Sequence, residues 1–296
     1  MVPLQIKLDP SFFEEEVRDG YTVSAETKKL WAIQLDLLYE FDRVCKLHGL
    51  RYFLDSGTCL GAVRHKGYIP WDDDIDVIML REDYNKLLEI GPSAFKSPYF
   101  FQNAMTDADI PLGYSKLRRD GTCQIKKAVI KEKLQCHNGI WIDIFVLDAL
   151  PEDEQLRHER EKERDAFNQR MFMLVPPRGD KGLKKIAKMI RYAGYRLRYG
   201  SLKKEFIRYN RFAQEFESAD AEHVGAFTFF RTFFYKKEWY ASTVSLPFEG
   251  FSFPVPAGYH EYLTCIYGAD YMTPKKFGNG HDCLIDTDKS YKEILK

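Results

Sequence analysis

Residues 53–80 read FLDSGTCLGAVRHKGYIPWDDDIDVIML, and this stretch decides the fold of the chain and points to its chemistry. It starts with a short turn at 55–57 and ends in an apolar run at 75–80, which predicts a buried strand. Four carboxylates lie just before or inside that strand: Asp72, Asp73, Asp74 and Asp76. Clustered like charges repel one another, so their place beside a buried strand indicates a bound divalent cation, Mg²⁺ or Mn²⁺.

The spacing of the acids predicts which of them bind the cation. Alternate side chains of a strand share a face, so Asp74 and Asp76 are expected to converge. A solvated acidic loop is the alternative, and the apolar strand that follows at once argues against it. Asp143 is the single acid of the apolar strand predicted at 140–145, where a lone carboxylate is costly to bury. We therefore predict Asp143 as a third ligand, with a structural ion pair as the alternative.

Basic and aromatic residues around these acids are candidates for binding a phosphorylated substrate. The Ser56-Gly57 turn lets backbone N–H groups approach a phosphate closely. Two basic groups are placed to neutralise phosphate charge, although a solvated surface is the alternative for each: Arg64, His65 and Lys66, and then Lys116, Arg118 and Arg119. Three aromatic residues are predicted in the core or in a pocket wall, where an aromatic face also suits a quaternary ammonium: Trp71, Tyr114 and Trp141.

Composition limits the classes of partner and compartment. The chain of 296 residues carries 44 basic and 44 acidic residues, so no net field attracts a nucleic acid polymer. Six widely spaced cysteines without a C-x-x-C pair predict reduced thiols in a cytoplasmic protein. The first residues lack a basic leader with an apolar core, so we expect no secretory signal. No apolar stretch is long enough to cross a bilayer.

Periodicity predicts an α+β fold, a mixed sheet flanked by helices. Helices are expected at 24–48, 58–64 and 82–90, and strands at 50–54, 74–80, 99–102, 113–118 and 140–145. We predict one domain over 1–296, with its core at about 24–150 and 225–285 and a helical insertion at about 151–224. Within the insertion, residues 181–211 carry eleven Lys and Arg against Glu205, a net charge of +10. This stretch is expected either at an anionic membrane surface or as a solvated helical face.

Several motifs closely resemble the LicD family of phosphocholine transferases, which share a nucleotidyltransferase-type fold with the fukutin-related proteins. The strongest likeness lies in LDSGTCLGAVRHKG at 54–67 and IPWDDDID at 69–76. It resumes in GIWIDIFVLD at 139–148 and again in short motifs between 248 and 272. Ser56 and Cys59 depart from the pattern, where Gly and Leu are expected. The Gly280-His281-Asp282 ending lacks a second histidine, which puts a role for His281 in doubt.

The resemblance implies a reaction and roles for the motif residues. A CDP-activated alcohol phosphate, most often CDP-choline, is attacked by a sugar hydroxyl of a bacterial surface glycan that is in some cases lipid-linked, and CMP leaves. Asp74 and Asp76 are implied as metal ligands, Asp143 as third ligand or general base, and Asp72 and Asp73 as orienting residues or proton acceptors. The substrate-binding residues are expected to be Ser56, Gly57, Thr58, Arg64, His65, Lys66, Trp71, Lys116 and Arg118. The alternatives are CDP-ribitol or CDP-glycerol as the donor, and a non-catalytic module that binds glycan or membrane.

Overall fold

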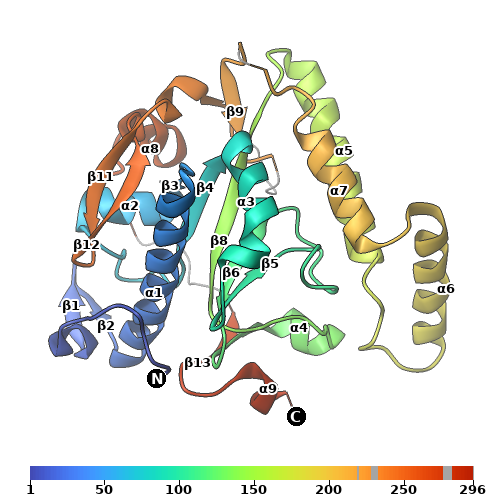
Figure 1. Ribbon diagram of the computed structural model, residues 1–296, viewed down its shortest axis with the longest axis horizontal. Helices are drawn as coiled ribbons and strands as arrows, with labels where there is room; N and C mark the ends of the chain where they lie inside the picture. The colour runs from blue at the N-terminus through green and yellow to red at the C-terminus, as the bar shows by residue number, and fades with distance from the viewer. Residues whose placement is uncertain (219, 228–232, 276–281, 296) are drawn as a thin grey trace.

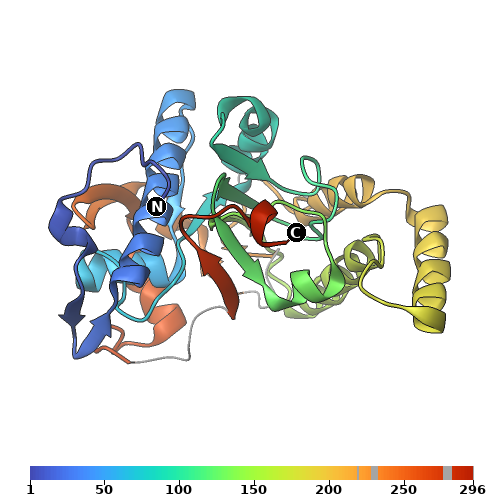
Figure 2. The same cartoon turned by 90° about the horizontal axis from the view of Figure 1, so that it is seen from below.

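The computed structural model describes residues 1–218, 220–227, 233–275 and 282–295. Its centre is a seven-stranded mixed sheet with helices packed against it, as the ribbon views show (Figures 1 and 2). In chain order the strands of this sheet are β3 Phe53–Leu54, β4 Asp76–Leu80, β5 Tyr99–Gln102, β6 Ser115–Arg119, β8 Trp141–Ala149, β9 His223–Gly225 and β10 Tyr235–Lys236. This architecture confirms the predicted α+β class.

The remaining elements surround the central sheet. The longer helices are α1 Ala25–His48, α2 Ser56–His65, α3 Arg81–Ala94, α5 Glu154–Met173, α6 Gly182–Tyr199, α7 Leu202–Ala213 and α8 Tyr259–Tyr267. Short helical turns are η1 Pro10–Phe13, α4 Lys127–Glu132, η2 Lys237–Tyr240 and α9 Tyr291–Ile294. Three two-stranded sheets complete the structure: β1 Glu16–Arg18 with β2 Tyr21–Val23, β11 Thr243–Phe248 with β12 Phe251–Pro256, and β7 Cys123–Lys126 with β13 Cys283–Asp286.

Strand β8 organises the sheet, because three other strands pair with it. It runs parallel to β4 along one edge, and along the other edge it pairs antiparallel first with β6 and then with β9. All nine of its residues are buried, which is typical of a central strand. The structure therefore confirms the strand predicted at 140–145 and extends it to Ala149. The predicted strand at 113–118 is β6, and that at 99–102 is β5.

Helix α1 is bounded by the residues that the sequence indicated. The Ser24 side chain accepts a hydrogen bond from the Thr27 N–H at 3.2 Å, and Gly49 ends the helix with φ of 63°. Its apolar side is fully buried, Trp31 and Phe41 included, and it packs against β6 and β8. Helix α3 packs against β4 and β8. These two helices lie on one face of the central strands, in front of the sheet in Figure 1.

The strand predicted at 74–80 begins two residues later in the structure. Strand β4 begins at Asp76, and residues 72–75 are extended without belonging to the sheet. Side chains of α1 donate hydrogen bonds to backbone carbonyls of this segment. Trp31 Nε1 donates to Asp72 O at 2.9 Å, and Gln34 Nε2 donates to Asp73 O at 2.8 Å. Contact with β8 begins only at Ile75, whose carbonyl accepts a hydrogen bond from the Asp143 N–H at 3.0 Å. The Asp run is therefore a fixed loop in front of the strand.

The segment at 151–224 contains three helices and a second hydrophobic cluster. Buried residues of α5 and α7, among them Met171, Phe206 and Tyr209, form this cluster away from the main core. A buried ion pair joins it to the sheet: Arg81 Nε donates to Asp148 at 2.5 Å, and the same guanidinium donates to Asn210 of α7 at 2.8 Å. The basic stretch at 181–211 forms α6 and most of α7. None of the helices within the described ranges has the length and apolar character that crossing a bilayer requires.

Candidate functional site

An acidic pocket of about 290 Å³ opens where β4 begins and α2 begins. It brings together seven residues that the sequence singled out: Ser56, Gly57, Arg64, Trp71, Asp72, Asp74 and Asp76. Tyr267 and Lys275, near the other end of the chain, complete its wall together with aliphatic side chains. The turn, the acidic segment and one arginine of the first basic group therefore meet in space. Sequence reasoning missed Tyr267 and Lys275, and the short motif around Tyr267 was the one available signal.

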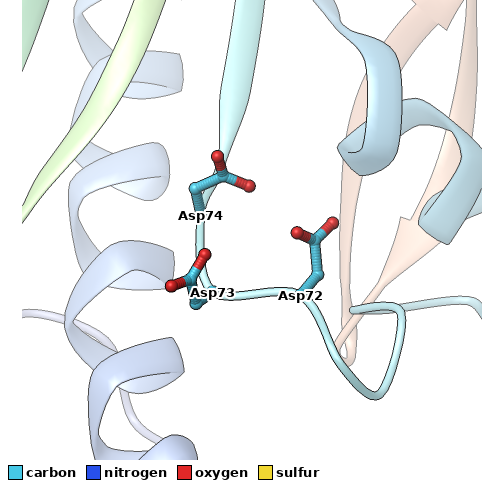
Figure 3. Close-up of side chains that lie close together, drawn as sticks. All are labelled: Asp72, Asp73 and Asp74. Atoms are coloured by element: carbon cyan, nitrogen blue, oxygen red, sulfur yellow. The ribbon is translucent and has the colours of Figure 1, made fainter. Parts of the chain in front are cut away.

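Three carboxylates of this region converge, and they are not the three that the spacing predicts. Single oxygens of Asp72, Asp73 and Asp74 all lie within 4.8 Å of one another, and Figure 3 shows the side chains gathered around one space. The predicted trio of Asp74, Asp76 and Asp143 does not form such a group within the described part of the chain. The reason is that residues 72–74 form a loop, so strand alternation does not govern their side chains. Carboxylate oxygens are the ligands that Mg²⁺ prefers, and this donor set fits such an ion.

Asp76 lies beside Asp143, and Asp143 lies beside Lys116, in a row across three strands. Asp76 and Asp143 are register partners on the parallel pair β4 and β8, and Lys116 and Asp143 are partners on the antiparallel pair β6 and β8. Lys116 Nζ forms an ion pair with Asp143 Oδ1, and Trp141 Nε1 donates to Oδ2 at 3.0 Å. The ion pair weighed as the alternative for Asp143 is therefore present. Each carboxylate oxygen of Asp143 has a second lone pair that these contacts do not use and that could bind a cation. A ligand role for Asp143 therefore stays a prediction.

The electrostatics of the site show an excess of negative charge on its acidic side. Burial and the neighbouring carboxylates raise the pKa of Asp72 and of Asp76 well above the usual value. On the other side of the row, burial lowers the pKa of Lys116 to about 8 in spite of Asp143, and burial also lowers that of Arg118. Carboxyl groups that resist ionisation become good ligands when a cation supplies the missing charge.

The start of α2 is held by a residue from the C-terminal part of the chain. The Tyr262 hydroxyl of α8 donates to the Asp55 carboxylate and accepts a hydrogen bond from the Ser56 N–H at 3.0 Å. Burial raises the pKa of Asp55. Ser56 has φ of 44°, a conformation that favours glycine, and this explains why the resemblance leads one to expect Gly at this position. Thr58 does not line the pocket: its hydroxyl accepts from the Asp76 N–H at 2.9 Å and positions that residue.

Gly57 has a steric role that the sequence did not show. A Cβ at this position would lie 2.7 Å from Oδ2 of Asp72. The missing side chain therefore makes room for a carboxylate of the converging trio, in addition to any approach to phosphate.

The first predicted basic group is divided between the pocket and other contacts. Arg64 lines the pocket, and its guanidinium donates to the backbone carbonyl of Tyr271 at 2.7 Å. His65 and Lys66 are absent from the pocket lining. His65 contacts Asp19 at 2.7 Å, and Lys66 ends α2 in a left-handed conformation with φ of 57°. These contacts are structural, and a role of His65 and Lys66 in substrate binding stays a prediction.

A second cavity of about 530 Å³ lies next to the row, on the side of Lys116. Lys116, Arg118 and Lys126 enter it around Trp141, at 4.5, 4.8 and 5.7 Å from the ring centroid. Tyr114 and Trp141 belong to its wall, as predicted for aromatic residues of a pocket. Arg119 points elsewhere, and its guanidinium donates to the Pro3 carbonyl. His281 lies outside the described residues.

Comparison with protein families shows which class of domain one part of the chain resembles. Residues 49–109 match the family model of the LicD/FKTN/FKRP nucleotidyltransferase domain. This range contains the turn, α2, the acidic segment and β4, which together line the acidic pocket.

Individual relatives point in the same direction. The chain is 26% identical to the lipopolysaccharide cholinephosphotransferase LicD of Haemophilus influenzae over 249 residues. This alignment covers 80% of this chain and 88% of that protein. A stretch of 112 residues is 33% identical to an uncharacterized protein of Rickettsia prowazekii, 38% of each chain. Forty residues, 14% of this chain and 8% of the relative, are 48% identical to the human ribitol 5-phosphate transferase FKRP. These findings confirm the resemblance to the LicD family.

Proposed function

We propose that this protein transfers phosphocholine from CDP-choline to a hydroxyl group of a bacterial cell-surface glycan and releases CMP. The observation that carries the proposal is the row of Asp76, Asp143 and Lys116 across three strands. This row lies between the acidic pocket and the 530 Å³ cavity, which we call the cationic cavity because basic side chains line it. Phosphoryl transfer needs positioning and charge neutralisation more than covalent chemistry, and a boundary between opposite charges supplies both. The lipopolysaccharide cholinephosphotransferase relative, matched over most of both chains, supports this choice of donor and acceptor.

In this proposal the acidic side holds the cation and the basic side holds phosphate. Asp72, Asp73 and Asp74 would bind Mg²⁺ or Mn²⁺, with Asp76 and Asp143 adjoining it. When bound, the cation would neutralise charge on the donor diphosphate. Lys116 and Arg118 would hold phosphate oxygens and stabilise the charge on the departing CMP.

The chain's own residues also account for positioning and for the proton. The acceptor hydroxyl attacks the phosphorus atom that carries choline, the bond from that phosphorus to the CMP oxygen breaks, and the hydroxyl proton must leave. Asp143 is the proposed acceptor of this proton, because its carboxylate adjoins the cation site beside Asp76 and a positioned carboxylate can act as a general base. Arg64, at the rim of the same pocket, would screen the donor phosphates, and the Trp71 ring is a candidate face for the choline cation.

One other donor class is supported by a specific finding. The local likeness to a ribitol 5-phosphate transferase covers only 40 residues, but it is high in that stretch. A CDP-activated polyol would use the same diphosphate and cation contacts, and only choline carries a permanent cation that an aromatic face attracts. Competition between CDP-choline, CDP-ribitol and CDP-glycerol therefore separates the two proposals.

The test is a CMP-release assay with these three donors, a glycan acceptor extract, and either Mg²⁺, Mn²⁺ or EDTA. We expect release from CDP-choline that EDTA abolishes, and a loss of about 10²–10³-fold in Asp74→Asn, the range for removing a charge-stabilising group. Asp282→Asn is the matched control, since this exposed acid pairs with Lys127 on the surface. Release in EDTA, or full activity of Asp74→Asn, would overturn the proposed site. No turnover with any donor would favour a binding module instead. A cytoplasmic location follows from the use of a CDP-activated donor and belongs to the same proposal.

A further inference from the structure

Helix α6 presents its aliphatic side to the outside of the molecule. Leu183, Ile186, Ile190 and Leu197 follow at i, i+3, i+7 and i+14, so they share one face of the helix. Their exposed fractions are 85%, 56%, 69% and 91%. In both ribbon views α6 lies at the outer edge of the molecule, away from the central sheet (Figures 1 and 2). A monomeric protein in water rarely keeps such a face uncovered.

The opposite face of α6 attaches it to the rest of the chain. Lys188, Tyr192, Tyr195 and Tyr199 are its less exposed residues in the helix interior, and they recur at intervals of four, three and four. Tyr195 and Tyr199 pack against the second hydrophobic cluster, and the Arg170 guanidinium of α5 lies 5.4 Å from the Tyr199 ring. Lys188 pairs with Glu132 at 3.6 Å and also with Asp180. The orientation of the helix is therefore fixed by contacts on its aromatic side.

The charges of α6 indicate which kind of surface its aliphatic face would bind. The helix has six basic residues and no acidic residue. Helical spacing places Arg191 and Arg198 on one flank of the aliphatic face and Lys185 and Arg196 on the other, and all four are exposed. Lys184 pairs with Asp180 at 3.1 Å. Long basic side chains on both borders of an apolar face can reach phosphate groups while the face enters the acyl boundary. A second copy of the chain would bring the same positive charges together, which disfavours self-association here.

We propose that α6 binds an anionic lipid surface, with its aliphatic face at the headgroup boundary and its basic borders on lipid phosphates. Lys188, Arg191 and Tyr192 of the same helix form part of the wall of the 530 Å³ cavity, which also contains Lys116 and Arg118. Binding through the aliphatic face would leave α6 between the lipid surface and this cavity, because Lys188 and Tyr192 lie on the opposite face of the helix. The inference concerns binding alone and does not depend on the donor or on catalysis.

The test is co-sedimentation of the full chain with vesicles, in the absence of nucleotide and acceptor. We expect binding to phosphatidylglycerol–phosphatidylcholine vesicles, at least about 10-fold weaker binding to pure phosphatidylcholine, and weakening by salt because exposed charges are screened. The double variant Ile186→Glu/Ile190→Glu should lose at least about 10-fold in affinity for the anionic vesicles, since it places charge in the apolar boundary.

The controls separate this surface from general effects. Val17→Glu/Leu47→Glu changes two aliphatic residues that are each 69% exposed on other elements, and it should bind like the wild type. Circular dichroism of both double variants checks the fold. Absence of wild-type binding, or equal binding by the α6 variant, would overturn the proposal. So would a concentration-dependent dimer that the α6 variant abolishes, because a second copy would then cover the face. Asp74→Asn should bind vesicles normally, so failure of the proposed transferase site and failure of this surface are distinguishable.

Discussion

Lys116 on β6 forms an ion pair with Asp143 on β8, and the two residues are register partners in the sheet. Both side chains are buried, and Trp141 binds the second carboxylate oxygen at 3.0 Å. A buried pair of this kind orients the carboxylate and limits its repulsion with Asp76 on the next strand. The lysine also faces the cationic cavity, so it belongs at once to the acidic row and to the basic wall.

Lys116→Met should therefore impair turnover while it strengthens cation binding. Removal of the ammonium leaves Asp143 more negative, which attracts a divalent ion, and it removes a donor that would hold phosphate. We expect kcat to fall by about 10²-fold or more, with half-maximal activity at a lower Mg²⁺ concentration. Steady-state CMP release against Mg²⁺ concentration measures both effects. Lys127→Met is the control, because that lysine is 74% exposed and pairs on the surface. A weaker apparent Mg²⁺ affinity in Lys116→Met would contradict this arrangement.

Gly57→Ala should damage the cation site without unfolding the protein. The new methyl group would meet the Asp72 carboxylate at 2.7 Å, and the end of that side chain can move aside. We expect the Mg²⁺ concentration for half-maximal activity to rise by about 10-fold, which corresponds to about 1.4 kcal/mol of binding free energy, and the urea midpoint to change little. Gly20→Ala provides a contrast: that glycine has open space around it but φ of 71°, so the substitution should cost stability and leave Mg²⁺ dependence unchanged. If Gly57→Ala left the Mg²⁺ dependence of activity unchanged, Asp72 would not be a ligand of the cation.

The raised pKa of Asp72 should make the metal-free protein less stable as the pH rises. Its folded-state pKa lies above the unfolded value of about 3.9, so the folded protein binds more protons in that window. The free energy of unfolding then falls as pH increases through the folded pKa. Urea unfolding between about pH 5 and pH 8 in EDTA measures this slope.

Two comparisons isolate this effect. His65 and His137 have lowered pKa values, caused mainly by burial, and these give the opposite slope below about pH 6.5. Subtracting the free energy of unfolding of Asp72→Asn from that of the wild type removes the contribution of the two histidines. This difference should become smaller towards low pH. Stabilisation by Mg²⁺ should grow with pH, because the cation competes with protons for the carboxylates. A Mg²⁺ effect independent of pH would show that the ion binds elsewhere.

Arg81→Ala should be among the most destabilising single changes outside the site. It leaves the carboxylate of Asp148 without its partner at 0% exposure, and it removes the hydrogen bond to Asn210 in α7. Breaking a buried pair from one side costs about 3–5 kcal/mol. Lys86→Ala is the contrast: its pair with Glu82 joins side chains that are 53% and 74% exposed and contributes about 0–1 kcal/mol. Urea unfolding compares them, and equal midpoints for the two variants would contradict the role given to this pair.

The sequence determined much of the local structure because the signals are local. Ser24 and Gly49 bound α1, the apolar runs predicted β4, β5, β6 and β8, and the acidic motif located the pocket. The division of the basic stretch into α6 and α7, with the aliphatic face of α6 outward, was not determined, because amphipathicity does not say which face meets the protein.

Tertiary structure decided which of the marked residues meet. Trp31 and Gln34 of α1 hold residues 72 and 73 out of the sheet, so the converging oxygens belong to Asp72, Asp73 and Asp74. Pairing of β6 with β8 brought Lys116 to Asp143, and α8 placed Tyr262 on Asp55. Residue types and their spacing thus set the chemistry available to this protein. Strand register and long-range hydrogen bonds, which join residues far apart in the chain, selected the groups that share a site.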